Sequence, residues 1–204
     1  MSLLFSPVLP AADELIIDDF SSGNLDGWGV RSFVGETSYQ LVEQQGRPVL
    51  KAQSLGTASA LYKEIKVDLR QTPYLNWSWR IENIYSIKDQ RVKAGDDFAA
   101  RIYVVFKTGI FPWNTRALNY VWSNYAVDAA QWPNPFTDKA IMIPLRAGVS
   151  QTGQWHRERV NIREDYLRVF KEPIDSIDGI AIMTDGDNSG GAATAYYGTI
   201  SFSQ

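Results

Sequence analysis

The sequence predicts an all-β protein, a jelly-roll-like sandwich of two antiparallel sheets with one short helix. Three observations lead to this fold class. Runs of β-forming residues recur about every 8 to 15 positions, with turn-forming residues between them, as in sandwiches and barrels. One run, residues 74–81, alternates strictly between apolar and polar side chains. Only one segment, residues 161–171, has helical spacing.

The predicted strands follow one another from the N-terminus with short connections. They cover residues 14–20, 28–34, 38–44, 47–53, 59–68, 74–81, 97–107, 117–123, 139–146, 155–160, 177–184 and 194–203. In the run at 74–81 the odd-numbered side chains are large and apolar and point to one side of the strand. We therefore expect Trp77 and Trp79 to be buried in the core.

The run at 97–107 combines a core face with a polar face. Alternation directs its even-numbered residues, from Phe98 to Phe106, toward the core. Asp97, Arg101 and Tyr103 then share the opposite face with the small Ala99, which leaves room above the sheet.

The run at 177–184 shows the same combination near the C-terminus. Ile180 and Ile182 face one way, while Gly179 and Ala181 face the other way together with Asp185. If the two runs are neighbours in one sheet, their polar residues line one shallow groove. Its predicted members are Asp97, Arg101, Tyr103 and Asp185.

The helix is predicted from its cap and from its apolar stripe. Asn161 can cap the first turn, and Glu164 stands at the third helical position. The stripe consists of Ile162, Tyr166, Val169 and Phe170.

The composition predicts one globular domain over residues 13–204. The chain has 204 residues, is 45% hydrophobic and carries a formal net charge of −3, so it can bury a sizeable core. Residues 1–12 are apolar, but they fall short of the ~20 residues of a membrane span, so no transmembrane segment is expected. We interpret them as the remnant of a secretory signal, with an artificial chain end as the alternative. The signal predicts a periplasmic or secreted protein.

The scarcity of Cys and His excludes several chemistries. The chain has no Cys and one His, so thiol nucleophiles, disulfides and paired-His zinc sites are excluded. A Ser-His-Asp triad would have to include His156. The chain has no run of Lys and Arg, so no nucleic-acid partner is expected. The oligomeric state is left open.

The loop after residue 184 has two interpretations. Asp185, Asp187 and Ser189 stand at positions one, three and five of an oxygen-ligand loop with Gly190 at six, which predicts a calcium site. The second interpretation is an ordinary turn. Tyr196 occupies the position where a calcium loop has its bidentate Glu, and a turn rich in Asp, Asn, Ser and Gly needs no ion. Calcium is the only cofactor that the sequence indicates.

Aromatic residues gather in one strand and the loop after it. They are Tyr120, Trp122, Tyr125, Trp132 and Phe136. Aromatic residues are good strand and core residues, but an exposed ring beside carboxylates and Arg can also hold a sugar.

Three classes of function remain open. The leading hypothesis is a non-catalytic module that binds a carbohydrate or glycoconjugate. Its predicted contacts are Asp97, Arg101, Tyr103, Trp122 and Asp185, and no catalytic residue is assigned. The second is a glycoside hydrolase that uses two of Asp96, Asp97, Asp185 and Asp187 as acid and base. The third is a structural or envelope-interaction protein without a small ligand.

Several strings resemble a bacterial family called domain of unknown function 3047. They are the residues 77–80, 93–106, 118–122 and 179–188, and the resemblance extends over roughly residues 15–203. It implies a bacterial origin and export, and it supplies no catalytic residue, because the family has no assigned activity. The first and last strands, at residues 17–20 and 197–202, are also similar to those of galactose-binding jelly rolls, which supports the fold.

Overall fold

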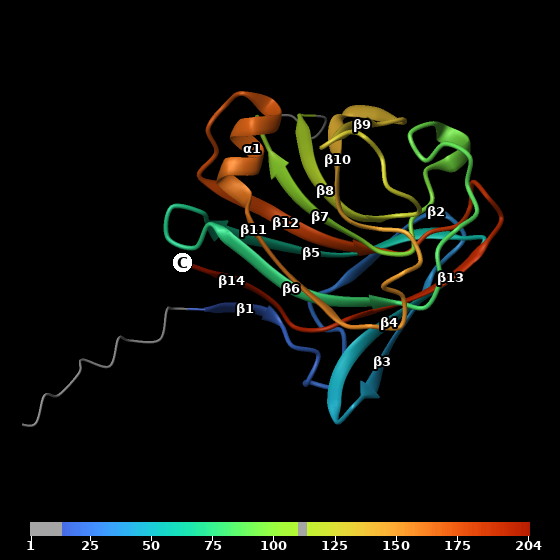
Figure 1. Ribbon diagram of the computed structural model, residues 1–204. Helices are drawn as coiled ribbons and strands as arrows, with labels where there is room; N and C mark the ends of the chain where they lie inside the picture. The colour runs from blue at the N-terminus through green and yellow to red at the C-terminus, as the bar shows by residue number, and fades with distance from the viewer. Residues whose placement is uncertain (1–13, 110–113) are drawn as a thin grey trace, which may run out of the picture.

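The computed structural model describes residues 14–109 and 114–204, and these residues form two sheets packed face to face (Figure 1). The predicted signal remnant, residues 1–12, lies outside the described residues. One sheet has the strand order β1-β14-β6-β13-β4-β3, and β11 also pairs with β6. Its strands are β1 (Leu15–Asp18), β3 (Ser38–Gln44), β4 (Arg47–Leu55), β6 (Tyr74–Ile81), β11 (His156–Asn161), β13 (Ala192–Tyr197) and β14 (Ile200–Ser203).

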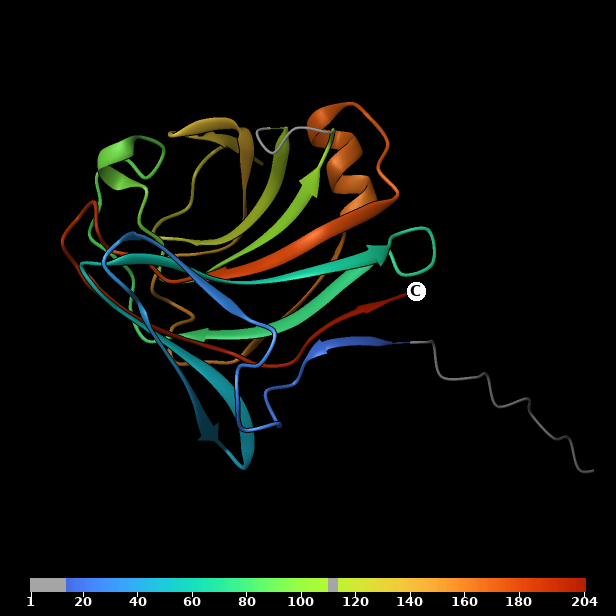
Figure 2. The ribbon, with the colours of Figure 1, turned by 180° about the vertical axis from the view of Figure 1, so that it is seen from behind.

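The second sheet has the order β2-β5-β12-β7-β8-β10-β9. In the view from behind, β2 lies beside β5 (Figure 2). Its strands are β2 (Gly29–Val34), β5 (Ala58–Asp68), β7 (Arg101–Lys107), β8 (Thr115–Ser123), β9 (Trp132–Asn134), β10 (Thr137–Ala147) and β12 (Ser176–Met183).

One pairing departs from the predicted antiparallel arrangement. Strand β10 runs parallel to β8, and the short β9 pairs antiparallel with β10 at the edge of the sheet. The segment between β8 and β10, predicted to be a loop, therefore contains a strand. All other pairings of the described strands are antiparallel, so the sandwich architecture itself is confirmed.

The helix α1 (Ile162–Phe170) forms where the sequence predicts it. The Asn161 side chain accepts a hydrogen bond from the Glu164 backbone N–H at 3.2 Å, so the predicted cap is confirmed. Tyr166 packs edge-on against Phe106 of β7, with ring centroids 4.6 Å apart. A short 3₁₀ turn, η1 (Lys93–Gly95), precedes β7. In the described part of the chain, no helix combines the length and hydropathy needed to cross a membrane.

The core lies between the sheets and contains the predicted tryptophans. Trp77 and Trp79 are 3% and 0% exposed, and their rings meet edge-on at 5.4 Å. The Trp79 Nε1–H donates to Glu158 Oε1 of β11 at 3.0 Å, which satisfies the buried indole. The register predicted for residues 74–81 is therefore confirmed.

The alternation predicted for residues 97–107 is wrong in its first part. Strand β7 begins only at Arg101, and the preceding residues follow an irregular path. Ala99 and Ala100 both contact the main core, whereas Phe98 packs on the other face of the sheet against Trp132, at 6.5 Å between ring centroids. Phe98 therefore lies on the same face as Arg101. The predicted alternation fails here because it applies only within a regular strand.

Candidate functional site

Two of the predicted site residues, Arg101 and Asp185, form a buried ion pair. Strands β7 and β12 are neighbours, as the groove requires, and Met183 pairs with Arg101 in register. The Arg101 Nε donates to Asp185 Oδ1 at 2.8 Å, and Nη2 donates to Asp185 Oδ2. Both side chains are at most 2% exposed. This is the two-point geometry in which Arg binds a carboxylate most strongly.

Further groups surround the same guanidinium. Arg101 Nη1 lies 3.4 Å from each carboxylate oxygen of Asp96, and Nη2 donates to the Asp96 carbonyl. Nη1 also lies 3.3 Å from the Tyr103 hydroxyl, and the guanidinium stacks 4.7 Å from the Phe98 ring centroid. Burial is the largest single effect and lowers the pKa of Arg101, but the charges of Asp96, Tyr103 and Asp97 and the hydrogen bond to Asp96 together outweigh it, so the net shift is upward. Arg101 is therefore permanently charged and fixed in position.

Asp97 forms hydrogen bonds with the loop that we predict from the sequence to bind calcium. One of its carboxylate oxygens accepts the backbone and side-chain N–H groups of Asn188, each at 3.1 Å. The other accepts the Ser189 backbone N–H at 2.6 Å. These bonds tie residues 187–191 to the start of the 97–107 segment.

The structure gathers an acidic cluster that differs from the predicted calcium set. Oxygen atoms of Asp97, Asp185 and Asp187 lie within 4.8 Å of one another. Ser189, the third predicted ligand, contacts Asp97 through its backbone, and its Oγ accepts the Gly191 N–H. Burial, followed by the nearby charge of Asp97, raises the pKa of the Asp187 carboxyl. Calcium binding at this cluster stays a prediction.

The predicted contacts converge, but their burial changes their role. Asp97, Arg101 and Asp185 are 0%, 1% and 1% exposed, so their polar atoms are engaged inside the protein and do not face a surface groove. Trp122 is 0% exposed and packs against Trp79 at 5.9 Å between ring centroids, so its prediction as a sugar contact is wrong. Of the five predicted contacts, Tyr103 is half-buried and the other four are buried. The sequence could not predict this burial, because strand alternation shows which residues share a face but not what covers that face.

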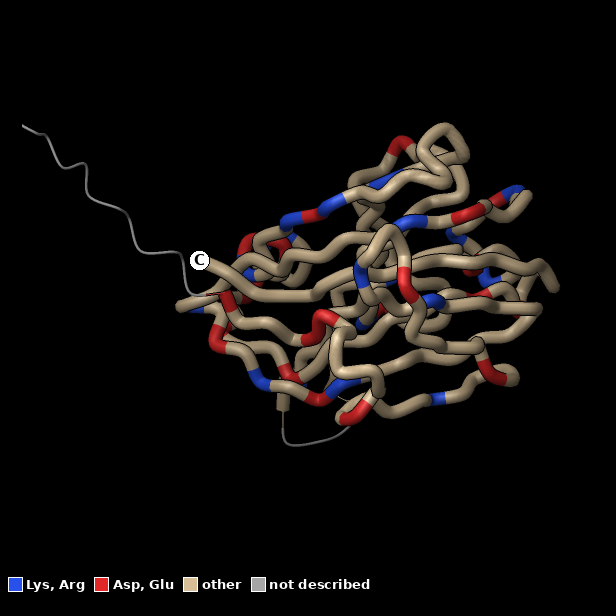
Figure 3. Tube along the Cα trace, turned by 90° about the horizontal axis from the view of Figure 1, so that it is seen from below, with Lys and Arg blue, Asp and Glu red and all other residues tan. Residues whose placement is uncertain are grey.

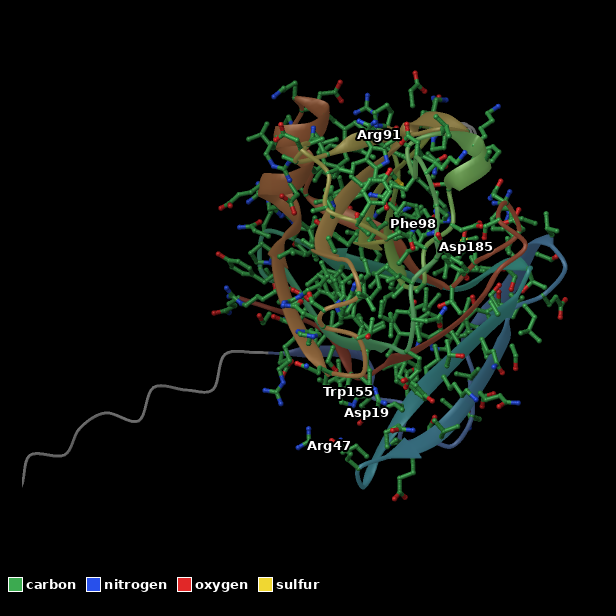
Figure 4. The ribbon with its side chains drawn as sticks, turned by 45° about the vertical axis from the view of Figure 1, so that its right-hand side comes forward. Asp19, Arg47, Arg91, Phe98, Trp155 and Asp185 are labelled. Carbon is green, nitrogen blue, oxygen red and sulfur yellow. The ribbon has the colours of Figure 1, made fainter. Side chains whose placement is uncertain are left out.

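A hollow of about 490 Å³ lies on the outer face of the other sheet. It is lined by the turn after β1, the β3–β4 hairpin, the middle of β6, the start of β11 and the bend between β13 and β14. Ser78 belongs to it because it alternates with the buried Trp77 and Trp79 and points outward. Figure 4 shows Trp155, Asp19 and Arg47 near one another at one end of the molecule, away from Phe98 and Asp185.

The floor of the hollow depends on a close approach at Gly198. This residue forms the bend between β13 and β14, and its N–H donates to the Ser78 carbonyl at 2.9 Å. A Cβ at position 198 would overlap the Ser78 hydroxyl and would lie 3.8 Å from the Trp155 ring. The glycine therefore allows both side chains to pack against the bend.

Two turns fix the rim of the hollow. Gln45 and Gly46 connect β3 to β4 with φ values of 55° and 75°, the arrangement of a two-residue hairpin turn that matches the sheet twist. In the turn after β1, Asp19 accepts hydrogen bonds from the Ser21 N–H at 3.0 Å and hydroxyl at 2.6 Å. These bonds lower the pKa of Asp19, which keeps its carboxylate ionised.

Trp155 differs from the other tryptophans that the structure describes in being unengaged, by which we mean that its ring has neither an aromatic nor a hydrogen-bond partner. Among the tryptophans that the structure describes, it alone has neither an aromatic-ring contact nor a side-chain hydrogen bond. Its side chain is half-buried, so part of the ring is open to the hollow. Sequence reasoning missed this residue. The available signal was a Trp at the start of a run that is otherwise mostly polar, where an apolar face to bury it is lacking.

The comparison with protein families establishes where this chain belongs. A family model described as "protein of unknown function (DUF3047)" matches residues 26–201, most of the chain. The chain is a DUF3047 protein. The resemblance indicated by the sequence strings is thus confirmed, and both Arg101 and Trp155 of this DUF3047 protein lie within the matched residues.

Solved structures resemble this DUF3047 protein in fold. A carbohydrate-binding module of the β-sandwich superfamily is 16% identical, with 93% of this chain and 62% of that one covered and a TM-score of 0.46. Cellulose induced protein Cip1 is 12% identical over 91% and 95% of the two chains, with a TM-score of 0.49. Endoglucanase Cel12A from Rhodothermus marinus is 12% identical over 93% and 99%, with a TM-score of 0.48.

These similarities are remote. The DUF3047 chain spans 62% of the length of the carbohydrate-binding module named above, and the TM-scores of the three structures lie below 0.5. We therefore draw no functional conclusion from them. No curated protein matches the sequence.

Proposed function

We propose that this protein is a non-catalytic carbohydrate-binding β-sandwich that holds a sugar in the hollow beside Trp155. The observation that supports this function is the open, unengaged Trp155 ring in a hollow whose remaining lining is mainly polar. A sugar ring can stack its apolar C–H face on an indole while its hydroxyls bond to polar neighbours such as Gln44 and Ser78.

Binding without cleavage is favoured over hydrolysis by the lining of the hollow. Glycosidases of the common type use two carboxylates that flank the scissile bond. Among the described residues that line the hollow, Asp19 alone carries a carboxylate. Three of the four aspartates considered for the hydrolase, Asp96, Asp97 and Asp185, are at most 4% exposed. An exported location would fit a polysaccharide ligand, and it remains part of this proposal.

The proposal predicts a direct role for Trp155. The test is isothermal titration calorimetry with hydroxyethyl cellulose, xyloglucan, arabinoxylan, polygalacturonate and alginate. We expect at least one of them to bind. We expect Trp155→Ala to weaken that binding tenfold or more, the equivalent of losing about 1.4 kcal/mol. The control is Phe136→Ala, which removes an exposed ring, 57% accessible, that does not line the hollow.

Three outcomes separate the hypotheses. Binding that Phe136→Ala preserves and Trp155→Ala abolishes supports the proposal. Binding that neither substitution changes places the ligand elsewhere on the molecule and overturns the role of the hollow. A lack of binding to all five polysaccharides overturns the function and favours the structural or envelope-interaction class. Thermal unfolding of each variant checks that the fold is retained.

A further inference from the structure

Two arginines that line the hollow have no partner for their charge. The side chains of Arg47 and Arg157 make neither a hydrogen bond, an ion pair nor a ring contact among the residues that the structure describes. Every other described arginine has a carboxylate, a carbonyl, an amide or an aromatic ring against its guanidinium. The two unpaired guanidinium groups therefore occur together, at the one hollow that also contains the unengaged Trp155.

The fold brings these arginines together from distant parts of the chain. Arg47 directly follows the Gln45–Gly46 turn, which fixes the start of β4. Arg157 lies in β11 opposite Ser78 of β6, and both residues line the hollow. Neither arginine pairs with Asp19, since no nitrogen of either lies within 4.0 Å of its carboxylate.

The charge of the hollow is opposite to that of the whole chain. The two arginines and the single Asp19 give the described lining a formal net charge of +1, whereas the whole chain carries −3. A concave surface with an excess of one sign of charge attracts ligands of the opposite sign. A guanidinium has a planar pair of donors that matches a carboxylate.

We propose that the ligand is an acidic polysaccharide, one whose uronic acid units present a carboxylate to Arg47 and Arg157 while a sugar ring stacks on Trp155. This inference rests on the proposed function and adds the class of carbohydrate. The proposal requires only one carboxylate in the part of the polysaccharide that occupies the hollow. The hydroxyls of the bound sugar remain available to Gln44 and Ser78.

The test compares ligands that differ only in the charge of the carboxyl group. We would titrate the protein with polygalacturonate and with the same polymer after full methyl esterification, which keeps the backbone and removes the charge. We expect at least tenfold tighter binding of the acid form, and we expect that preference to decrease as NaCl rises from 50 to 300 mM. Dextran sulfate serves as a polyanion without carboxylates, and we expect it to bind more weakly than polygalacturonate.

Variants show whether the two arginines supply this preference. Arg47→Gln/Arg157→Gln should bring the affinities for the acid and ester forms within about twofold of each other. The matched control is Arg91→Gln, because Arg91 is an exposed arginine that lies away from Arg47 in Figure 4. If the double variant keeps the full preference for the acid form, other residues recognise the carboxylate and the inference is overturned.

The outcomes also distinguish this inference from the proposed function. Two results would overturn the inference of an acidic ligand and leave the proposed carbohydrate binding intact. One is equal affinity for the acid and ester forms, and the other is Trp155-dependent binding of xyloglucan alone. Tighter binding of dextran sulfate than of polygalacturonate indicates a general polyanion site and overturns the uronate. A lack of binding to every polysaccharide overturns both proposals.

Discussion

At the scale of single residues, Arg101 is the most constrained side chain of the buried cluster. It faces the carboxylates of Asp96 and Asp185, and both of these are almost completely buried. Buried charges are tolerated when they are paired and hydrogen-bonded, and their removal leaves the partners uncompensated. Arg101 therefore stabilises the junction between the segment before β7 and the loop after β12.

Replacing Arg101 should reveal this role in the stability of the protein. We expect Arg101→Met to lower the free energy of unfolding by about 3 to 5 kcal/mol, the usual effect of breaking a buried pair. Urea denaturation followed by circular dichroism measures the change. Arg91→Met is the control and should have little effect, because Arg91 pairs with Asp89 in solvent. A loss in Arg101→Met no greater than that of the control would show that the pair is dispensable.

Asp187 should make stability depend on pH. Its folded-state pKa is raised, so the folded protein holds this proton more tightly than the unfolded chain does. The stabilisation is complete below the ordinary aspartate pKa, ~3.9, and is lost as pH rises through the raised folded value. We therefore expect Asp187→Asn to have a higher melting temperature than the wild type at pH 7 and an equal one at pH 3.5. A difference that does not shrink on acidification would contradict this.

Calcium, if it binds, acts at the same carboxylates. The sequence prediction is that millimolar calcium raises the melting temperature of the wild type, because a ligand bound only by the folded state stabilises it. Asp187→Asn should lose this response, since Asp187 is one of the three clustered aspartates. An unchanged melting curve of the wild type with calcium and with chelator would remove the calcium prediction.

At the scale of elements, the bend between β13 and β14 links the sheet to the hollow. Gly198→Ala places a Cβ against the Ser78 hydroxyl. We expect a loss of about 1 to 3 kcal/mol in the free energy of unfolding, the range for overpacking. The double variant Gly198→Ala/Ser78→Ala should recover most of it, because the Ser78 Cβ would lie at an ordinary contact distance of 3.7 Å. Thermal unfolding of both variants measures the effect, and a lack of recovery would place the strain elsewhere.

At the scale of elements, the sequence predicts some strands, the helix and one contact, but not the irregular features of the fold. Local patterns correctly predict the strand with Trp77 and Trp79 and the capped helix α1. They also predict that Arg101 and Asp185 meet, because period-two alternation places them on one face of two strands. The parallel pairing of β8 with β10 and the irregular path before Arg101 carry no local signature. The hollow is also unpredictable from patterns, since it joins five segments that only tertiary structure brings together.

At the scale of the whole molecule, the charges are mixed over the surface. Figure 3 shows basic and acidic positions interspersed along the chain, with no large region of one sign. Ion pairs between exposed side chains, such as Arg91 with Asp89, are of small energetic value. Against this background the two unpaired arginines of the hollow stand out by the lack of a partner, which is why we assign specificity to them and stability to the buried cluster around Arg101.

The topology of β6 also has a consequence for synthesis of the chain. This strand holds Trp77 and Trp79, yet among the described strands its partners are β11, β13 and β14, all of which follow residue 155. In a nascent chain, β6 therefore lacks all of these strand neighbours until the last quarter of the chain has emerged. Contacts so distant in sequence form slowly, and exposed apolar strands promote aggregation meanwhile. Truncation before β11 would leave the strand that holds Trp77 and Trp79 without any of the sheet neighbours that the structure describes for it, as a substrate for chaperones and proteases.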